Sequence, residues 1–364
     1  MSRFELGMSV NYAKAWNVED AVREFFQNAI DEEKENPENK MSFNYNEDSQ
    51  ILTIGNKKSV LTPKTLLLGV SSKEGKSELI GEHGEGYKVA TVVLVRNGVT
   101  VRIYNNEKGE IWTSRVVRSK RYDSEVVCFD IEKKLFNKKE NLVIELEGIT
   151  KEMYSRIVEN ILHLQNVGEF MQSSEGRILL EERYSGKIFV EGLYVCTNSN
   201  VEKGYDFNAG MLKLDRDRGL VDTFDLKYVI AQMYLGLEDN DYIINHINDK
   251  DLAFVSSKLQ YCVRDRKDII SDGVYSAFLE EYGESAIPVV DSNSFNEYHE
   301  LGYKPVLVSR QVYEAINLKK RDLFSSYSIS DIDREFNEWI MRNSMWLSDS
   351  EIVKLRDLWK RKSK

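Results

Sequence analysis

Three polar side chains near the N-terminus have a spacing that could support chemistry. Glu24, Asn28 and Asp31 lie at i, i+4 and i+7, which on a helix places them within roughly 60° of one another. The remaining arc is apolar and includes Phe25 and Phe26. Oxygen ligands among aromatic side chains suit a metal ion and a water molecule. The alternative is a solvated stripe on an amphipathic helix.

A second candidate is the glycine-rich run GVSSKEGKSELIGEHGEGYK, residues 69–88. GVSSKEGKS nearly spells a Walker A loop, but five residues, not four, separate Gly69 from Gly75, and that motif requires four. The preceding LTPKTLLLG favours a helix over the required strand. GEHGEGYK remains, and glycines there would let the backbone approach a phosphate at a helix N-terminus.

Composition restricts the class of protein. The 364 residues are 41% hydrophobic and 30% charged, as expected for a globular protein of two or three domains. We expect a cytoplasmic protein, since there is no membrane-spanning run or signal peptide. The cysteines Cys128, Cys196 and Cys262 form no zinc or disulfide pattern and are expected to be buried thiols. A net charge of −10 does not support broad nucleic-acid binding, although the basic C-terminal tail leaves a local patch open.

The elements that must position these residues can be read from capping and periodicity. Asn17 should cap a helix that ends near Pro37. We expect a hairpin (42–46 with 50–56), a helix (63–69), the glycine-rich loop and a second helix (87–95) to follow. Four strands should come next, at 100–105, 110–118, 126–132 and 142–148. A helical connector then leads to a second αβ unit containing 187–196, 209–214 and a helix at 224–237. Strand, helix and strand over 285–309, and closing helices, complete the chain.

Two motifs together carry a resemblance to a family. EFFQNAID has the form E-x-x-x-N-x-x-D, and GEHGEGYK the form G-x-x-G-x-G-x-K. In this order they resemble the N box and G2 box of the GHKL ATPases, which include gyrase B subunits, heat-shock chaperones, histidine kinases, MutL and MORC proteins. The resemblance covers residues 1 to about 150 well and 176–235 more weakly. It implies an α+β protein: a Bergerat-type α/β sandwich over 1–150, a connector with a transducer-like αβ unit over 151–235, and a C-terminal α/β region of unknown role over 236–364.

The resemblance implies a role for each matching residue. Glu24 would be the general base that activates the attacking water, and Asn28 would bind Mg²⁺ through its amide oxygen. Asp31 would support the water network beside adenine. The G2 box would bind the ATP phosphates, with His83 in phosphate contact or stacked in the lid; the residues concerned are Gly81, His83, Gly84, Glu85, Gly86 and Lys88.

Two further stretches are compared with the family. LLGVSSKEG resembles the lid of MutL-like members, so Ser71, Ser72 and Lys73 are candidates near the nucleotide. The run LTIGNKKSV matches the G1 box but has Asn56 in place of the aspartate that accepts from the adenine amino group. An asparagine can still accept, without charge and with its own NH₂ needing a partner. ATP is therefore the expected ligand, and GTP stays open.

A catalytic cation is expected from the second unit. LKLDRDRG resembles the loop from which an arginine of the chaperone middle domain reaches the γ-phosphate. In register, Arg218 takes that place, with Arg216 and Lys213 as alternatives. The other interpretation is a set of exposed salt bridges among these charges, each worth little.

Three functions follow as hypotheses. The first is a slow, Mg²⁺-dependent ATPase whose cycle moves domains or pairs two subunits and acts on an unknown protein partner, in phage–host conflict or genome maintenance. The second, a histidine kinase, is disfavoured because no histidine precedes His83. The third is a nucleotide-sensing protein that binds a host factor and scarcely hydrolyses ATP, which the change at Asn56 keeps open.

Overall fold

The computed structural model describes most of the chain in two compact units. The described residues are 2–63, 86–214, 223–237, 239–259, 261–262, 264–300, 304–323, 336, 339–340, 343 and 346–362. Unit 1 comprises 1–171, 175–199 and 203–222, and unit 2 comprises 172–174, 200–202 and 223–364. The domain boundaries expected near 150 and 235 stay a prediction.

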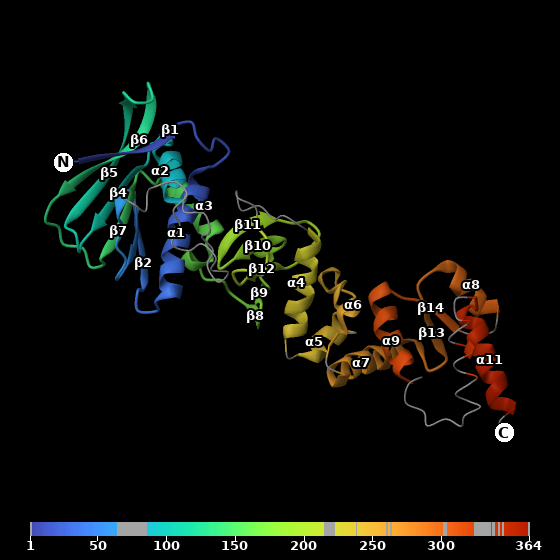
Figure 1. The fold of residues 1–364 in the computed structure, drawn as a ribbon. Helices are drawn as coiled ribbons and strands as arrows, with labels where there is room; N and C mark the ends of the chain where they lie inside the picture. The colour runs from blue at the N-terminus through green and yellow to red at the C-terminus, as the bar shows by residue number, and fades with distance from the viewer. Residues whose placement is uncertain are drawn as a thin grey trace. The chain divides into compact units, whose positions relative to one another are not determined.

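A seven-stranded antiparallel sheet forms the first layer of unit 1 (Figure 1). The strand order is β1-β6-β5-β4-β7-β3-β2. The expected hairpin and four later strands are confirmed. β1 was not predicted; it pairs with β6 at the edge of the sheet. The strands are β1 (Ser2–Ser9), β2 (Met41–Asn46), β3 (Ile51–Asn56), β4 (Thr100–Asn105), β5 (Glu110–Ser119), β6 (Ser124–Lys133) and β7 (Leu142–Glu147).

Among the residues that the structure describes in unit 1, three helices pack beside this sheet: α1 (Val18–Glu35), α2 (Gly86–Arg96) and α3 (Lys151–Asn160). α1 begins with a capping box, in which Asn17 Oδ1 accepts from the Asp20 N–H (2.8 Å) and the Asp20 carboxylate accepts from the Asn17 N–H (3.0 Å). The core is built from α1 residues such as Phe25 and alternate residues of the strands, including Leu52 and Ile54, all essentially inaccessible to solvent. Alternation at period two explains why one face of each strand supplies this core.

A second sheet of five strands has the order β11-β10-β12-β9-β8, with β10 and β12 parallel. The 187–196 prediction is confirmed as β10 and β11. Residues 209–214 form no strand. A strand lies just before them instead, as β12. The strands are β8 (Phe170–Ser173), β9 (Gly176–Leu179), β10 (Lys187–Val190), β11 (Leu193–Thr197) and β12 (Gly204–Phe207), with 3-10 turns at Leu162–Leu164 (η2) and Glu182–Tyr184 (η3).

The described part of unit 2 is mainly helical and contains one parallel strand pair. The expected order of strand, helix and strand is confirmed as β13, α8 and β14, and the two strands pair in parallel. The elements are α4 (Thr223–Gly236), α5 (Asn240–Asn245), η4 (Lys250–Leu252), α6 (Val255–Leu259), α7 (Arg264–Tyr282), β13 (Ala286–Val289), α8 (Ser292–Glu300), β14 (Lys304–Leu307), α9 (Arg310–Leu323) and α11 (Asp349–Lys362). Among the described residues no helix combines the length and apolarity needed to cross a membrane.

The fold class expected from the sequence is confirmed: an α/β sandwich is followed by a second αβ unit and a mixed C-terminal region. The cysteines follow expectation in part. All three are free thiols, but Cys128 is buried whereas Cys196 and Cys262 are partly exposed. Burial raises the pKa of the Cys128 thiol.

Candidate functional site

The polar stripe of α1 is buried, which contradicts its interpretation as a solvated face. Glu24 is 2% exposed and Asp31 is inaccessible, while Asn28 is partly exposed. Ionisable carboxyl groups are rarely buried without compensation. Burial of two of them on one helix face therefore indicates a functional site or a polar network.

The orientation of the Asn28 amide is set by the helix itself. Its Nδ2 donates to the backbone carbonyl oxygen of Glu24, one turn earlier, at 2.8 Å. A carbonyl oxygen can only accept, so the nitrogen must be the amide atom that faces it. Oδ1 consequently lies at the opposite end of the amide, as an oxygen ligand requires.

Helix α2 approaches this stripe through its first residue. A Cβ built on Gly86 would overlap the Glu24 carboxylate and would lie 3.8 Å from Asn28 Nδ2. The end of the GEHGEGYK motif is therefore in contact with the EFFQNAID motif, although the two are far apart in the chain. Any larger residue at position 86 would therefore force the Glu24 carboxylate to move.

The next residues of α2 line the same helix–helix contact. Lys88 is inaccessible to solvent, and the Tyr87 ring packs edge-on against Phe25 of α1 with centroids 5.3 Å apart. Burial, with the nearby charges of Glu32 and Asp31, raises the pKa of Tyr87. A neutral tyrosine thus lies beside the acidic stripe, and the lysine that follows it is buried.

Asn56 lies at the end of β3 and its amide orientation is also determined. Its Nδ2 donates to the carbonyl oxygens of Ala29 (3.0 Å) and Asn39 (3.3 Å). Two carbonyl acceptors on one side identify that side as the NH₂ group. The sequence analysis noted that this NH₂ group needs a partner, and the two carbonyl oxygens supply it. Oδ1 is therefore the amide atom that a ligand could use.

The chain after β3 is held by a polar network. Asn39 donates to Ser59 Oγ (2.8 Å), which in turn donates to Glu32 of α1 (2.9 Å). The Asn105 amide both accepts from the Leu61 N–H and donates to the Leu61 carbonyl oxygen, each at 2.9 Å. These bonds fix the segment that leads away from Asn56.

Several predicted residues lie outside the described residues. They are Ser71, Ser72, Lys73, Gly81, His83, Gly84, Glu85, Arg216 and Arg218. Of the cation candidates, Lys213 is described and is exposed. The structure brings together Glu24, Asn28 and Gly86; the functional roles of all these residues stay predictions.

Two polar residues of α1 were overlooked in the sequence. Arg23 donates through Nη1 to the carbonyl oxygen of Tyr194 on β11 (3.1 Å). Gln27 is 1% exposed, and its Oε1 has no hydrogen-bond partner among the described residues. Because Gln27 is at i+3 from Glu24, the same spacing rule that selected the stripe could have found it.

Comparison with known proteins identifies structural likenesses alone. No family model matches the chain, and no curated protein matches it in sequence. Similar structures include the ATPase region of Saccharomyces cerevisiae topoisomerase II bound to ICRF-187, with TM-score 0.33 and 8% identity over 49% of this chain and 62% of that one. The ATPase and transducer domains of Balamuthia mandrillaris topoisomerase II give TM-score 0.29 and 14% identity over 53% and 66%.

A second structure of the S. cerevisiae ATPase region gives TM-score 0.27 and 8% identity over 49% of this chain and 61% of that one. The chain spans just under two thirds of the length of each of these structures. The likeness is distant and assigns no role to any residue of this chain.

Proposed function

We propose that this chain binds Mg²⁺-ATP between α1, the end of β3 and the N-terminus of α2, and hydrolyses it slowly. The observation that carries the proposal is the contact of Gly86 with Glu24 beside Asn28. The start of α2, a helix N-terminus of the kind that favours phosphate, is thereby close to a buried carboxylate and to the Asn28 amide. Phosphoryl transfer requires mainly such positioning and charge neutralisation.

Glu24 is the proposed general base. Its carboxylate would orient a water molecule toward the γ-phosphate and accept a proton from it as the bond from the water oxygen to the γ-phosphorus forms and the bond from the γ-phosphorus to the ADP oxygen breaks. Burial beside Gly86 holds the carboxylate in place and excludes competing water. Asp31 and Gln27, on the same helix face, would complete the hydrogen bonds of nearby waters.

Asn28 Oδ1 is an oxygen ligand of the kind that Mg²⁺ prefers. Among the described residues no group of three or more His, Cys, Asp or Glu side chains forms a metal cluster. Mg²⁺ commonly keeps several waters and substrate phosphates and uses one or two protein ligands, so a single amide oxygen is consistent. The bound ion would neutralise phosphate charge. Lys88 and the predicted G2-box and lid residues would contact the phosphates, and Arg218, Arg216 or Lys213 would supply the cation.

Asn56 would recognise the nucleotide base through a hydrogen bond. Oδ1 is an acceptor, and the adenine amino group is a donor, whereas the corresponding guanine O6 is an acceptor and would be repelled. The geometry thus favours ATP over GTP, with a neutral contact in place of the family's charged one.

A second candidate is a protein that binds ATP without turning it over and acts by contacting a host factor. The substitution at Asn56 favours it, because binding without the family's aspartate departs from the ATPase pattern. Nucleotide-driven domain movement or homodimerisation, a cytoplasmic location and a role in phage–host conflict or genome maintenance stay proposals under either candidate.

The test is phosphate release and ATP affinity for wild type, Glu24→Gln and the control Glu35→Gln, an exposed carboxylate on the same helix. An ATPase should lose on the order of 10²–10⁴-fold in rate with Glu24→Gln at unchanged affinity, because a base acts in the transition state. Affinity without turnover in wild type would favour the second candidate, and absence of affinity would reject both.

A further inference from the structure

The turn between β10 and β11 has an unusual residue at its first position. Glu191 and Gly192 both adopt positive φ, +53° and +75°, as in a two-residue hairpin that normally uses Asn-Gly. A glutamate is strained in this left-handed region. Local strain that persists in a structure is a reason to ask what the side chain does.

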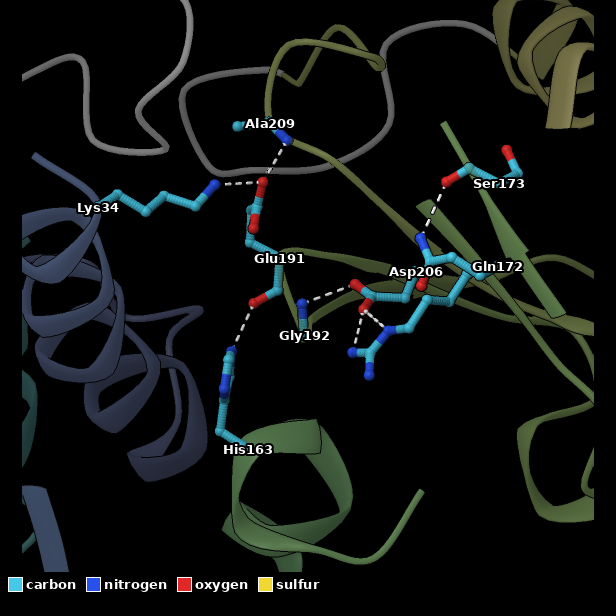
Figure 2. Close-up of polar contacts among 9 residues, drawn as sticks. Lys34, His163, Gln172, Ser173, Glu191, Gly192, Asp206 and Ala209 are labelled. Carbon is cyan, nitrogen blue, oxygen red and sulfur yellow. Dashed lines mark hydrogen bonds and ion pairs between the residues drawn. The ribbon is translucent and has the colours of Figure 1, made fainter. Parts of the chain in front are cut away.

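The Glu191 carboxylate joins two distant segments of unit 1. Its Oε1 forms an ion pair with Lys34 Nζ in the last turn of α1. The same oxygen accepts from the Ala209 N–H at 2.6 Å. Figure 2 shows Lys34 and Ala209 converging on this carboxylate, which is 15% exposed. A partly buried carboxylate makes charge-assisted hydrogen bonds stronger than those in open solvent.

The backbone of the turn is itself fixed. The Glu191 carbonyl oxygen lies 2.9 Å from His163 Nε2, and the Gly192 N–H donates to Asp206 Oδ1 at 2.6 Å. Arg177 holds the other oxygen of Asp206. A Cβ on Gly192 would lie 2.8 Å from His163 Nε2, closer than side chains tolerate. Glu191 is therefore presented to Lys34 from a rigid support.

We infer that Glu191 is a positioning residue that couples α1 to the segment following β12. Lys34 lies ten residues from Glu24, about 15 Å along the same helix. Ala209 directly precedes residues 210–214, which include the exposed Lys213. A displacement of α1 would be transmitted through Lys34 to Ala209. This inference rests on the proposed function, because it requires that nucleotide acts on α1.

The experiment uses the full chain with Lys34→Met, Lys34→Arg, Glu191→Gln and the Lys34→Met/Glu191→Gln double variant. Lys40→Met is the matched control, since Lys40 pairs with Glu33 near the same helix end but is 67% exposed. Three quantities are measured: the affinity for a non-hydrolysable ATP analogue, amide hydrogen exchange over 205–214 with and without that analogue, and the rate of phosphate release.

We expect the analogue to slow exchange over 205–214 in wild type, Lys34→Arg and Lys40→Met, but not in Lys34→Met or Glu191→Gln. Affinity should stay within about twofold while the maximal rate falls about fivefold to tenfold, as for typical coupling between sites. The double variant should be no worse than either single variant, because both remove one interaction.

Three results would overturn the inference while the proposed function stands: no protection of 205–214 in a wild type that binds the analogue, full protection in Lys34→Met, or Lys34→Arg behaving like Lys34→Met. A wild type that does not bind the analogue would instead overturn the proposed function, and the coupling with it.

Discussion

Gly86 at the start of α2 and Glu24 on α1 are in such close contact that a Cβ on Gly86 would overlap the Glu24 carboxylate. Gly86→Ala should therefore displace the carboxylate that we propose as the base. Because a displacement of about 1 Å can cost roughly 10²-fold in rate, we expect hydrolysis to fall by at least about tenfold. Phosphate release under saturating ATP checks this.

The same overlap should lower the unfolding temperature of Gly86→Ala. Glu24→Asp in that background shortens the acid and should recover the unfolding temperature without restoring hydrolysis. A Gly86→Ala protein with wild-type stability and rate would show that the contact is unimportant.

Asn28→Ala should weaken binding of Mg²⁺-ATP and leave binding of metal-free ATP nearly unchanged, because the amide oxygen is the proposed ligand. Changes around metal sites commonly cost about 10–100-fold in metal affinity. Asn28→Asp keeps an oxygen ligand and should retain most of the magnesium dependence. Calorimetry with and without Mg²⁺ measures both. Equal Mg²⁺-ATP affinity in Asn28→Ala would remove Asn28 from the site.

Asn56→Asp restores the residue typical of the resembled motif but should destabilise this protein. The carbonyl oxygens of Ala29 and Asn39 would lose their donor, and each unsatisfied buried group costs about 1–3 kcal/mol. We expect the free energy of unfolding in urea to fall by about 2 kcal/mol or more. The control is Asn46→Asp, because Asn46 Oδ1 accepts from the Ser49 N–H and an aspartate keeps that bond. A stable Asn56→Asp would contradict the assigned amide orientation.

Arg3 and Asp130 should make the attachment of β1 sensitive to acid. Arg3 Nε donates to Asp130 at 2.8 Å, and this bond, with Arg115, holds the pKa of Asp130 below its ordinary value of 3.8. A lowered folded-state pKa contributes stability that is present above 3.8 and is lost as the pH falls through the folded-state value. Arg3→Met should reduce stability at neutral pH and flatten this acid dependence. Urea unfolding at pH 6 and at about pH 3 tests the sign; a steeper acid loss in the variant would be inconsistent with it.

Local signals in the sequence were sufficient for the elements that carry the motifs. Asn17 and Asp20 cap α1 through bonds between residues three apart, and Pro37 disfavours continuation of the helix just before it. Alternation in 42–46 and 50–56 predicted β2 and β3. These features depend on neighbours in the chain, so composition and spacing are enough to predict them.

Tertiary structure alone decided the strand β1 and the parallel pairing of β10 with β12. The N-terminal residues were not recognised as a strand because an edge strand is stabilised by its partner, here β6, more than by its own pattern. β12 is only four residues long, too short for a periodicity to be resolved. Such pairings depend on residues distant in sequence, which no local window contains.

For the candidate site too, the sequence determined some features and the folded chain determined the others. The types and spacing of Glu24, Asn28 and Gly86 in the sequence by themselves determined which residues to consider, because a helix period and a glycine-rich loop are local properties. Burial of the stripe, the contact of Gly86 with Glu24, the direction of the Asn56 amide and the link from Lys34 to Glu191 required the folded chain. Each is a contact between segments far apart in sequence, and its geometry exists only once helices and sheets have packed together.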